Sequence, residues 1–276
     1  MKETNRKISL KKAILIVLGI IIILIASFVI YEIATRNNTY YIGEKNLQIP
    51  IFVYHHLVED ESQIEYDYME STVETFEKQI TGLMKLGYKP ISYEDLIKYK
   101  NGEIAIPKWS FLITFDDGYD DIYKYAFEIA KKYNIPMTSF AVDDQVGFDN
   151  CYGWEQAKEM HDSGLMSIYS HGRTHIEYDK VPTETLIEDA EIAYNHLCTE
   201  LNDNNLLKIF TYPYGLWNNE GIDALRERGF VQNLTDNMVN QSNKLDLSKL
   251  HRCYPLNDSL LKILIKIQYR SLRYGG

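Results

Sequence analysis

Short apolar runs alternate with longer amphipathic segments along most of the chain. The short runs are rich in β-branched and aromatic residues and indicate strands, while the longer segments carry apolar residues at helical spacing. The predicted strands are 49–54, 89–92, 110–115, 137–142, 166–169, 208–211 and 230–234, and the predicted helices are 73–86, 93–100, 120–133, 154–163, 182–201, 218–228 and 260–274. This alternation is typical of βαβ units and a parallel sheet. About seven strands without a Gly-x-Gly-x-x-Gly sequence predict an α/β fold of the (β/α) barrel type rather than a dinucleotide-binding sheet.

The first segment of the chain differs from the rest. Residues 13–31 contain no charged residue and are dominated by Ile, Leu and Val, so they are long enough to cross a bilayer as one helix. Five basic residues and one acid precede them, which predicts a cytoplasmic amino terminus. A cleaved signal peptide usually has a shorter apolar region and a small-residue cleavage site, and residues 34–36 offer only a weak one. We therefore expect a cytoplasmic tail at 1–12, a transmembrane signal anchor at 13–31, a juxtamembrane linker at 32–48 and one extracytoplasmic domain at 49–276, held at the cell membrane by a single span.

Charge and cysteine content restrict the classes of partner. Residues 1–36 hold six of the 29 basic and two of the 39 acidic residues. The remainder therefore carries 23 basic and 37 acidic residues, a formal charge of −14, which argues against nucleic acid as a partner. The three cysteines are widely separated and form no CxxC pair, so they predict neither a metal site nor a disulfide framework.

Two groups of polar residues follow predicted strands. Asp116 and Asp117 come directly after the strand 110–115, where an ordinary Asp-Gly turn is the alternative reading. His171 and His175 follow another strand, at a spacing that presents two imidazoles to one ion. Because a barrel gathers the carboxyl ends of its strands at one face, the two groups should meet. Two histidines and one carboxylate suit zinc or a similar divalent cation, with Asp117 as the third ligand and Asp116 as a base.

Three sequences, in their order along the chain, carry a resemblance to a known family. The chain resembles the polysaccharide deacetylase family (carbohydrate esterase family 4) in its first three motifs, which are matched by Thr114-Phe115-Asp116-Asp117-Gly118-Tyr119, Ser170-His171-x-x-x-His175 and Tyr212-Pro213-Tyr214-Gly215. The likeness extends over roughly residues 49–255. The Tyr54-His55 strand and the helix from Phe76 to Gly87 resemble the branch that includes poly-β-1,6-N-acetylglucosamine deacetylases.

The resemblance implies a fold, an activity and a set of site residues. It implies a distorted (β/α) barrel and a metal-dependent hydrolase that removes N-acetyl groups from an N-acetylglucosamine-containing surface polysaccharide. Asp116 matches the general base, and the metal ligands, for which Zn²⁺ is the favoured ion, are matched by Asp117, His171 and His175. Tyr214 matches the third motif, where a backbone N–H helps to hold the oxyanion in the substrate-binding site.

The chain also departs from the family pattern. The third motif usually begins with Arg, where this chain has Thr211, and the family's later acid motif has no good match. In the resembling branch, a histidine of the amino-terminal strand fills that place, so we expect His55 to be the general acid, with His56 as the second candidate. Adjacent strand residues face opposite ways, so only one should reach the site; both could also be ordinary strand-end polar residues. Two rival functions remain open: a catalytically silent glycan-binding member, and a carbohydrate O-acetyl esterase.

The last predicted helix, residues 260–274, carries a basic stripe formed by Lys262, Lys266, Arg270 and Arg273. With a membrane anchor nearby, this stripe could rest on anionic lipid headgroups. A basic stripe is more often the solvated face of a helix packed on the fold. The sequence leaves both readings open.

Overall fold

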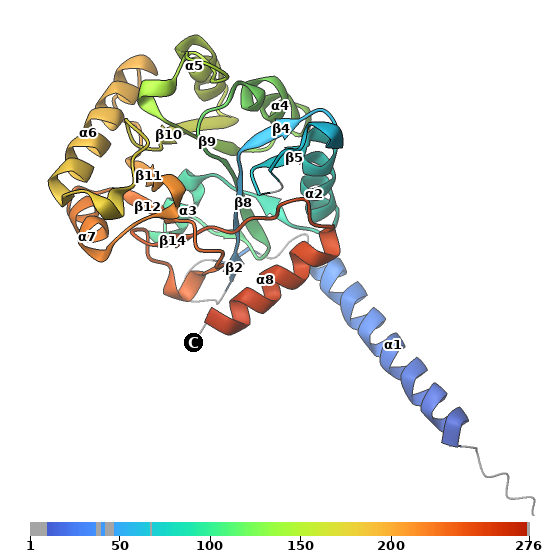
Figure 1. Ribbon diagram of the computed structural model, residues 1–276. Coiled ribbons are helices and arrows are strands. Elements are labelled where there is room, and N and C mark those ends of the chain that lie inside the picture. The colour runs from blue at the N-terminus through green and yellow to red at the C-terminus, as the bar shows by residue number, and fades with distance from the viewer. Residues whose placement is uncertain (1–9, 37–39, 42–46, 67, 275–276) are drawn as a thin grey trace, which may run out of the picture. The chain divides into compact units, whose positions relative to one another are not determined.

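A computed structural model describes residues 10–36, 40–41, 47–66 and 68–274 (Figure 1). The chain divides into two compact units, Met1–Thr39 and Tyr40–Gly276. The first contains helix α1 (Leu10–Arg36). Its segment Lys11–Phe28 is long and apolar enough to cross a membrane, a test that a signal sequence near the amino terminus also passes. The predicted tail before Leu10 and parts of the predicted linker, 37–39 and 42–46, lie outside the described residues.

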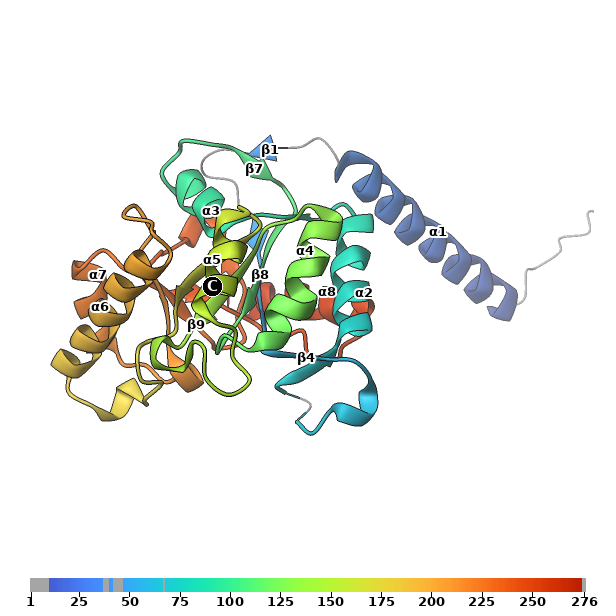
Figure 2. The same cartoon turned by 90° about the horizontal axis from the view of Figure 1, so that it is seen from above.

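The second unit is built on seven parallel strands that follow one another in sequence order (Figures 1 and 2). The strands are β3 (Ile51–Tyr54), β8 (Ser110–Phe115), β9 (Met137–Ala141), β10 (Met166–Ser170), β11 (Ile209–Thr211), β12 (Val231–Leu234) and β14 (Leu250–His251). The ring nearly closes just beyond β14, where Val53 N–H donates to the Cys253 carbonyl at 3.1 Å and Cys253 N–H donates to the Ile51 carbonyl at 2.9 Å. The predicted α/β barrel is therefore confirmed.

Helices pack around the outside of the barrel (Figure 2). They are α2 (Val73–Lys85), α3 (Tyr93–Lys100), α4 (Phe127–Tyr133), α5 (Trp154–Asp162), α6 (Thr183–Glu200), α7 (Asn219–Glu227) and α8 (Leu260–Tyr274), with a π-helical turn at Ile122–Ala126 before α4. Helix α2 shows why they form. Thr72 caps it by accepting the Thr75 backbone N–H at 3.1 Å, which stabilises a helix end by about 1 kcal/mol. Its buried face carries Phe76, Ile80 and Leu83 at helical spacing.

Short paired strands border the barrel. They are β1 (Tyr40–Tyr41) with β7 (Ile106–Pro107), β2 (Gln48–Ile49) with β13 (Asn240–Gln241), and β4 (His56–Val58) with β5 (Glu70–Thr72), while β6 (Lys89–Pro90) pairs with the start of β8. Single 3₁₀ turns lie at Glu61–Gln63, Asp143–Gln145, Tyr178–Lys180, Pro213–Gly215 and Ser242–Lys244. The β4–β5 pair matters for function, because it continues from β3 and forms one wall of the cavity described below.

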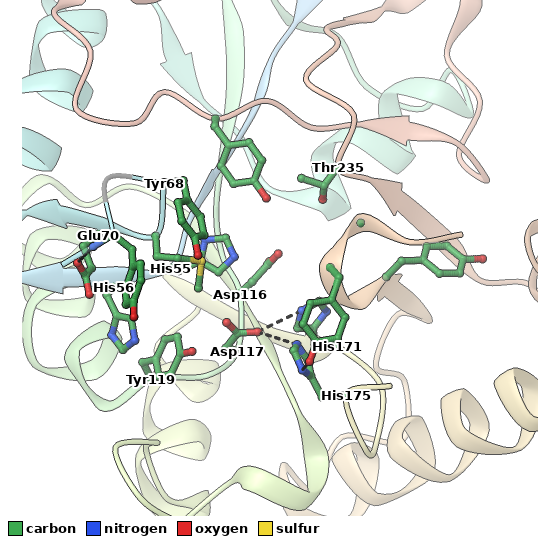
Figure 3. Close-up of a pocket in the computed structure, with 16 residues that line it drawn as sticks. His55, His56, Tyr68, Glu70, Asp116, Asp117, Tyr119, His171, His175 and Thr235 are labelled. Carbon is green, nitrogen blue, oxygen red and sulfur yellow. Dashed lines mark hydrogen bonds and ion pairs between the residues drawn. The ribbon is translucent and has the colours of Figure 1, made fainter. Parts of the chain in front are cut away.

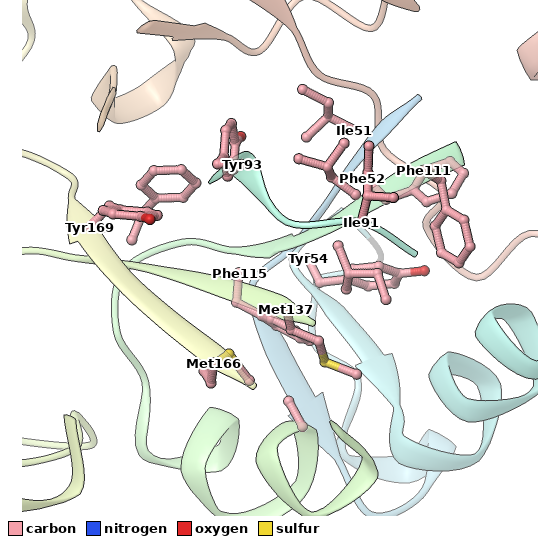
Figure 4. Packing of buried hydrophobic residues seen from close by; sticks show 14 of the residues in the cluster. Ile51, Phe52, Tyr54, Ile91, Tyr93, Phe111, Phe115, Met137, Met166 and Tyr169 are labelled. Atoms are coloured by element: carbon pink, nitrogen blue, oxygen red, sulfur yellow. The ribbon is translucent and has the colours of Figure 1, made fainter. Parts of the chain in front are cut away.

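Aromatic and aliphatic side chains fill the core around β3 and β8 (Figure 4). Every residue of β8 is buried, as expected for a strand that is covered on both sides. The rings of Phe52 and Phe111 lie 5.9 Å apart, and Tyr54 packs edge-on against Phe76 at 4.9 Å. Full burial of one such side chain contributes roughly 1.5–3 kcal/mol. This packing fixes the strand ends from which the polar residues of the site project.

The predicted number of barrel strands is correct, but one member differs. The predicted strand 89–92 is the two-residue β6, which pairs only with the first residues of β8. The seventh barrel strand is β14, and two residues are too few to give a periodic signal. The predicted helix 120–133 begins with the π-helical turn, whereas the other predicted helices agree with the structure to within one residue at each end.

Candidate active site

The carboxyl ends of the barrel strands surround a cavity of about 570 Å³ (Figure 3). Strand β8 runs directly into Asp116 and Asp117, β3 into His55, and β10 into His171. Tyrosines from separate segments complete much of the wall: Tyr66, Tyr68, Tyr119, Tyr212, Tyr214 and Tyr254. The two predicted groups of polar residues therefore meet in one cavity.

Asp117, His171 and His175 converge on one point of this cavity (Figure 3). Asp117 Oδ1 lies 3.2 Å from Nε2 of His171 and 3.2 Å from Nε2 of His175. Asp117 and His175 both have left-handed backbone conformations, with φ of 71° and 55°, which are uncommon for residues with a side chain and concentrate at functional sites.

Both histidines are oriented through their second ring nitrogen. Nδ1 of His171 donates to the Thr211 carbonyl at 3.0 Å, so Nε2 carries the lone pair that faces Asp117. Nδ1 of His175 lies 3.1 Å from Tyr214 Oη. Electron-pair donors that face one another in a largely buried pocket are able to hold a cation, and two imidazoles with one carboxylate fit a divalent ion such as zinc.

Asp116 borders the same cavity but is held by a different partner. Arg252 donates from Nη1 to Oδ1 and from Nη2 to Oδ2 of Asp116, each at 2.7 Å. The guanidinium is fully buried, and Nη2 also donates to Thr235 Oγ1 at 2.7 Å. This two-bond contact fixes the plane of the carboxylate and limits its rotation.

The ion pair also sets the charge state of Asp116. Burial alone would raise the pKa of this carboxyl, but the charge and hydrogen bonds of Arg252, together with the nearby His171 and His55, outweigh burial and hold the pKa below its usual range. Asp116 is therefore ionised near neutral pH and able to accept a proton. Thr211, which stands where the resembling family has Arg, contributes its carbonyl to His171, and the guanidinium of this site comes from Arg252 instead.

Sequence reasoning did not find Arg252. The residue follows β14, the strand that the sequence did not predict, and its neighbour His251 gave no motif. The sequence carries no local signal for this position, because a two-residue strand shows no period.

The two candidate acids have different environments. His55 is buried, and its Nδ1 has no hydrogen-bond partner among the described residues. Its ring lies parallel to that of Tyr254, with centroids 6.0 Å apart. Burial lowers the pKa of His55, and the nearby Asp116 and Asp117 offset this only in part.

His56 is engaged elsewhere. Its Nδ1 lies 2.6 Å from Asp121 Oδ2, and its ring stacks on Tyr119 with centroids 3.5 Å apart. His55 lies near Asp116 in the cavity, and His56 lies beside Tyr119 (Figure 3). His55 is thus the imidazole with an unengaged nitrogen, whereas His56 is held by the carboxylate of Asp121.

Comparison with known proteins agrees with this arrangement of residues. Residues 105–232 match the family model for polysaccharide deacetylase. The chain belongs to the polysaccharide deacetylase family. The family assignment made from the three motifs is confirmed, and the predicted enzyme class, a hydrolase, agrees with the family.

Curated relatives of this polysaccharide deacetylase come from bacteria. YxkH of Bacillus subtilis is 27% identical over 209 residues, which are 76% of this chain and 72% of that protein. A poly-β-1,6-N-acetyl-D-glucosamine N-deacetylase of Staphylococcus aureus is 30% identical over 169 residues, 56% of this chain and 57% of the relative. The matched region thus spans little more than half the length of the staphylococcal enzyme.

Solved structures share the fold of this polysaccharide deacetylase. IcaB from Ammonifex degensii matches with a TM-score of 0.69 and 25% identity, covering 83% of this chain and all of the other. The Streptococcus pyogenes deacetylase PplD matches with a TM-score of 0.72 and 21% identity, covering 81% of this chain and 99% of the other. The second likeness supports the barrel alone.

Gly172, between the two histidines, should be among the least replaceable glycines of this deacetylase. Its φ is +82°, and an added Cβ would lie 2.2 Å from Tyr178 Oη and 3.1 Å from Asp189 Oδ1. We expect Gly172→Ala to lower the free energy of unfolding by roughly 2–5 kcal/mol, from backbone strain and overpacking together. Denaturant unfolding of the full chain measures this change.

Gly229→Ala is the matched control for Gly172→Ala. Gly229 has nearly the same φ, +80°, but no atom lies within 4 Å of its added Cβ. Its substitution should lower the free energy of unfolding by the backbone strain alone, roughly 1–2 kcal/mol. If both variants lose the same free energy of unfolding, Tyr178 does not restrict the turn at Gly172.

Proposed function

We propose that this chain is a metal-dependent N-deacetylase that acts on an N-acetylglucosamine-containing surface polysaccharide. The observation that carries the proposal is a single cavity in which Asp116, ionised beside Arg252, adjoins the cluster of Asp117, His171 and His175. The staphylococcal relative named for poly-β-1,6-N-acetyl-D-glucosamine supports this class of substrate.

The metal would be held by Asp117, His171 and His175, whose ligand types favour Zn²⁺. When bound, a divalent cation acts as a Lewis acid toward an amide carbonyl and lowers the pKa of nearby water. The protein's own contribution is to keep the two histidines oriented, His171 through the Thr211 carbonyl and His175 through the Tyr214 hydroxyl.

Asp116 is the proposed general base. An amide is a poor electrophile, so water must lose a proton as it attacks the carbonyl carbon. Asp116 takes that proton, because Arg252 keeps it ionised and fixes its orientation. Holding the base in position before the reaction removes part of the entropic cost of attack. The backbone N–H beside Tyr214 is the proposed donor to the oxyanion that develops on the carbonyl.

His55 is the proposed general acid. It follows β3, which pairs with β8 directly before Asp116, so the base and the acid come from neighbouring strands. The leaving amine needs a proton on nitrogen when the carbon–nitrogen bond breaks. Because burial lowers the pKa of His55, protonated His55 is a stronger acid than free imidazole.

We also infer that α1 is an uncleaved signal anchor, with the domain that follows it outside the cytoplasm. The support is the length and apolar composition of α1 together with the basic residues that precede its apolar core. A surface-held deacetylase would meet its polymer at the cell envelope, and the acidic domain is compatible with a polymer that becomes cationic as acetyl groups leave.

Two rival functions use the same cavity. A silent glycan-binding member of the family would bind N-acetylglucosamine oligomers without releasing acetate. The ion pair that holds Asp116 in place, formed with Arg252, argues against such a function. A carbohydrate O-acetyl esterase would release acetate without producing a free amine. Measurement of both products distinguishes the three activities.

Removal of the metal should abolish activity reversibly. Dialysis of the full chain against a chelator should reduce acetate release from N-acetylglucosamine oligomers by at least about 10²-fold, because the Lewis acid is lost. Addition of Zn²⁺ should restore the rate with about one ion bound per chain, as expected for a single three-ligand site. His171→Ala should prevent this restoration. Full activity in a chain that metal analysis shows to be free of divalent ions would contradict the proposal.

Replacement of His55 should impair the chemical step. We expect His55→Gln to reduce kcat by roughly 10²–10⁴-fold, the usual contribution of a general acid, with Zn²⁺ binding unchanged. His56→Gln, the neighbouring histidine that Asp121 engages, should reduce kcat far less. A larger loss in His56→Gln than in His55→Gln would reverse the two assignments.

A further inference from the structure

Helix α8 exposes a row of apolar side chains on one face. Ile263 and Ile267 are buried in the core at 1% exposure each, whereas Leu261, Ile265 and Tyr269 are 68%, 58% and 54% exposed. The exposed three recur every four residues and span about 80° of the helix circumference. A single exposed Leu is ordinary, but a continuous row on a helix already packed through another face is a surface suited to an apolar partner.

A cationic face borders this row. Residues 260–274 contain Lys262, Lys266, Arg270 and Arg273 and no acidic residue, and helical spacing puts Lys262 and Lys266 between the exposed row and the buried residues. Lys262 and Lys266 both pair with Asp258, so the helix and Asp258 together carry a formal charge of +3, four bases minus one acid. An apolar row beside a cationic face fits the interface of a bilayer that contains anionic lipid.

The later part of α8 lies beside the start of β3, the end of that strand remote from the active site. Gln268 Nε2 donates to Gln48 Oε1 at 3.2 Å, and Gln48 lies in β2, just before β3 begins (Figure 1). His55, in contrast, follows the carboxyl end of β3. Gln48 is twelve positions after Arg36, the last residue of α1, so the chain between them spans at most about 40 Å. A membrane crossed by α1 is therefore within reach of this end of the barrel.

We propose that the row formed by Leu261, Ile265 and Tyr269 rests in the interface of an anionic bilayer, with Lys262 and Lys266 at the headgroups. Tyr is a residue type that favours this level of a membrane, and Lys stems can lie along apolar surface while their amines reach the headgroups. The inference rests on the proposed anchoring by α1 and adds a second contact with the membrane to it.

The test compares two matched tryptophan variants of the full chain in vesicles whose acyl chains carry bromine, a quencher of tryptophan fluorescence. Ile265→Trp puts the probe in the α8 row, and Phe148→Trp puts it at another exposed apolar position, which is 72% exposed. The unmodified chain supplies the background of its own tryptophans. In phosphatidylcholine vesicles with added phosphatidylglycerol, most of the fluorescence added by Ile265→Trp should be lost, while that added by Phe148→Trp should be retained. Phosphatidylcholine alone should give weaker quenching.

Extraction with alkaline carbonate separates the two hypotheses. If the chain resists extraction and Ile265→Trp is not quenched, the α8 proposal is overturned and the anchor stands. If carbonate removes the chain, the anchor fails, and quenching observed before extraction still supports binding of α8 to lipid. Unquenched fluorescence that shifts to the blue as the protein-to-lipid ratio rises would identify a second copy of the chain as the occupant and overturn the proposal.

Discussion

Asp116→Asn should reduce the rate of acetate release from N-acetylglucosamine oligomers by roughly 10²–10⁴-fold, the contribution of a general base. Asn keeps the size of the side chain, and its Oδ1 can still accept a hydrogen bond from Arg252, but the amide cannot take a proton from water. The loss should fall on kcat, with KM little changed, because the proton moves only in the transition state. Steady-state kinetics on the zinc-loaded full chain measures both constants.

Asp121→Asn provides the control for Asp116→Asn. Asp121 is also a carboxylate beside a histidine, His56, but it accepts the Leu57 N–H, belongs to no metal-binding cluster of the described residues and does not line the cavity. Its replacement should leave kcat within about tenfold of the unmodified chain, since general base catalysis would be intact. Zinc content should be equal in both variants. A fully active Asp116→Asn variant would remove the base from the mechanism.

Arg252→Met should lower the free energy of unfolding by about 3–5 kcal/mol, the loss expected when one partner of a buried ion pair is removed. Asp116 is 3% exposed, so its carboxylate would be left without a counter-charge or protonate. Protonation would also remove the base, and activity should fall together with stability. Chemical denaturation and acetate release, measured on the same preparation, test the two effects.

A double variant tests whether this loss of stability arises from the ion pair between Asp116 and Arg252. Asp116→Asn combined with Arg252→Met removes both charges, so its loss of stability should be smaller than the sum of the single losses, by about 0.5–3 kcal/mol. Arg226→Met, which disrupts the exposed pair of Arg226 with Asp223, should have an effect of no more than about 1 kcal/mol. Strictly additive losses at Asp116 and Arg252 would show that the two side chains do not stabilise each other.

Much of the barrel could be predicted because its strands and helices are long enough to show their periods. Strand β8 is a six-residue buried run, and α2 carries its apolar residues at helical spacing between a capping Thr72 and Gly87. The convergence of Asp117 with His171 and His175 also followed, since parallel strands of a barrel end at one face.

The remaining features depend on contacts between residues far apart in sequence. Arg252 lies 136 residues from Asp116, and the two-residue β14 that delivers it has no local signature. The choice between His55 and His56 likewise needed Asp121, 65 residues away, because local sequence does not indicate which imidazole is engaged. The exposed row of α8 could not be separated from its buried face without knowing which residues pack on the core.

The central claim is that this cavity hydrolyses the N-acetyl bond of an N-acetylglucosamine polymer. The most direct test is to measure acetate and free amine together, in one reaction of the zinc-loaded full chain with β-1,6-linked N-acetylglucosamine oligomers. The account predicts that acetate and free amine appear in equal amounts. With Asp116→Asn, both products should form only at the low residual rate expected for that variant. Binding of the oligomers and zinc without either product, or acetate released only from O-acetylated sugars, would contradict the account.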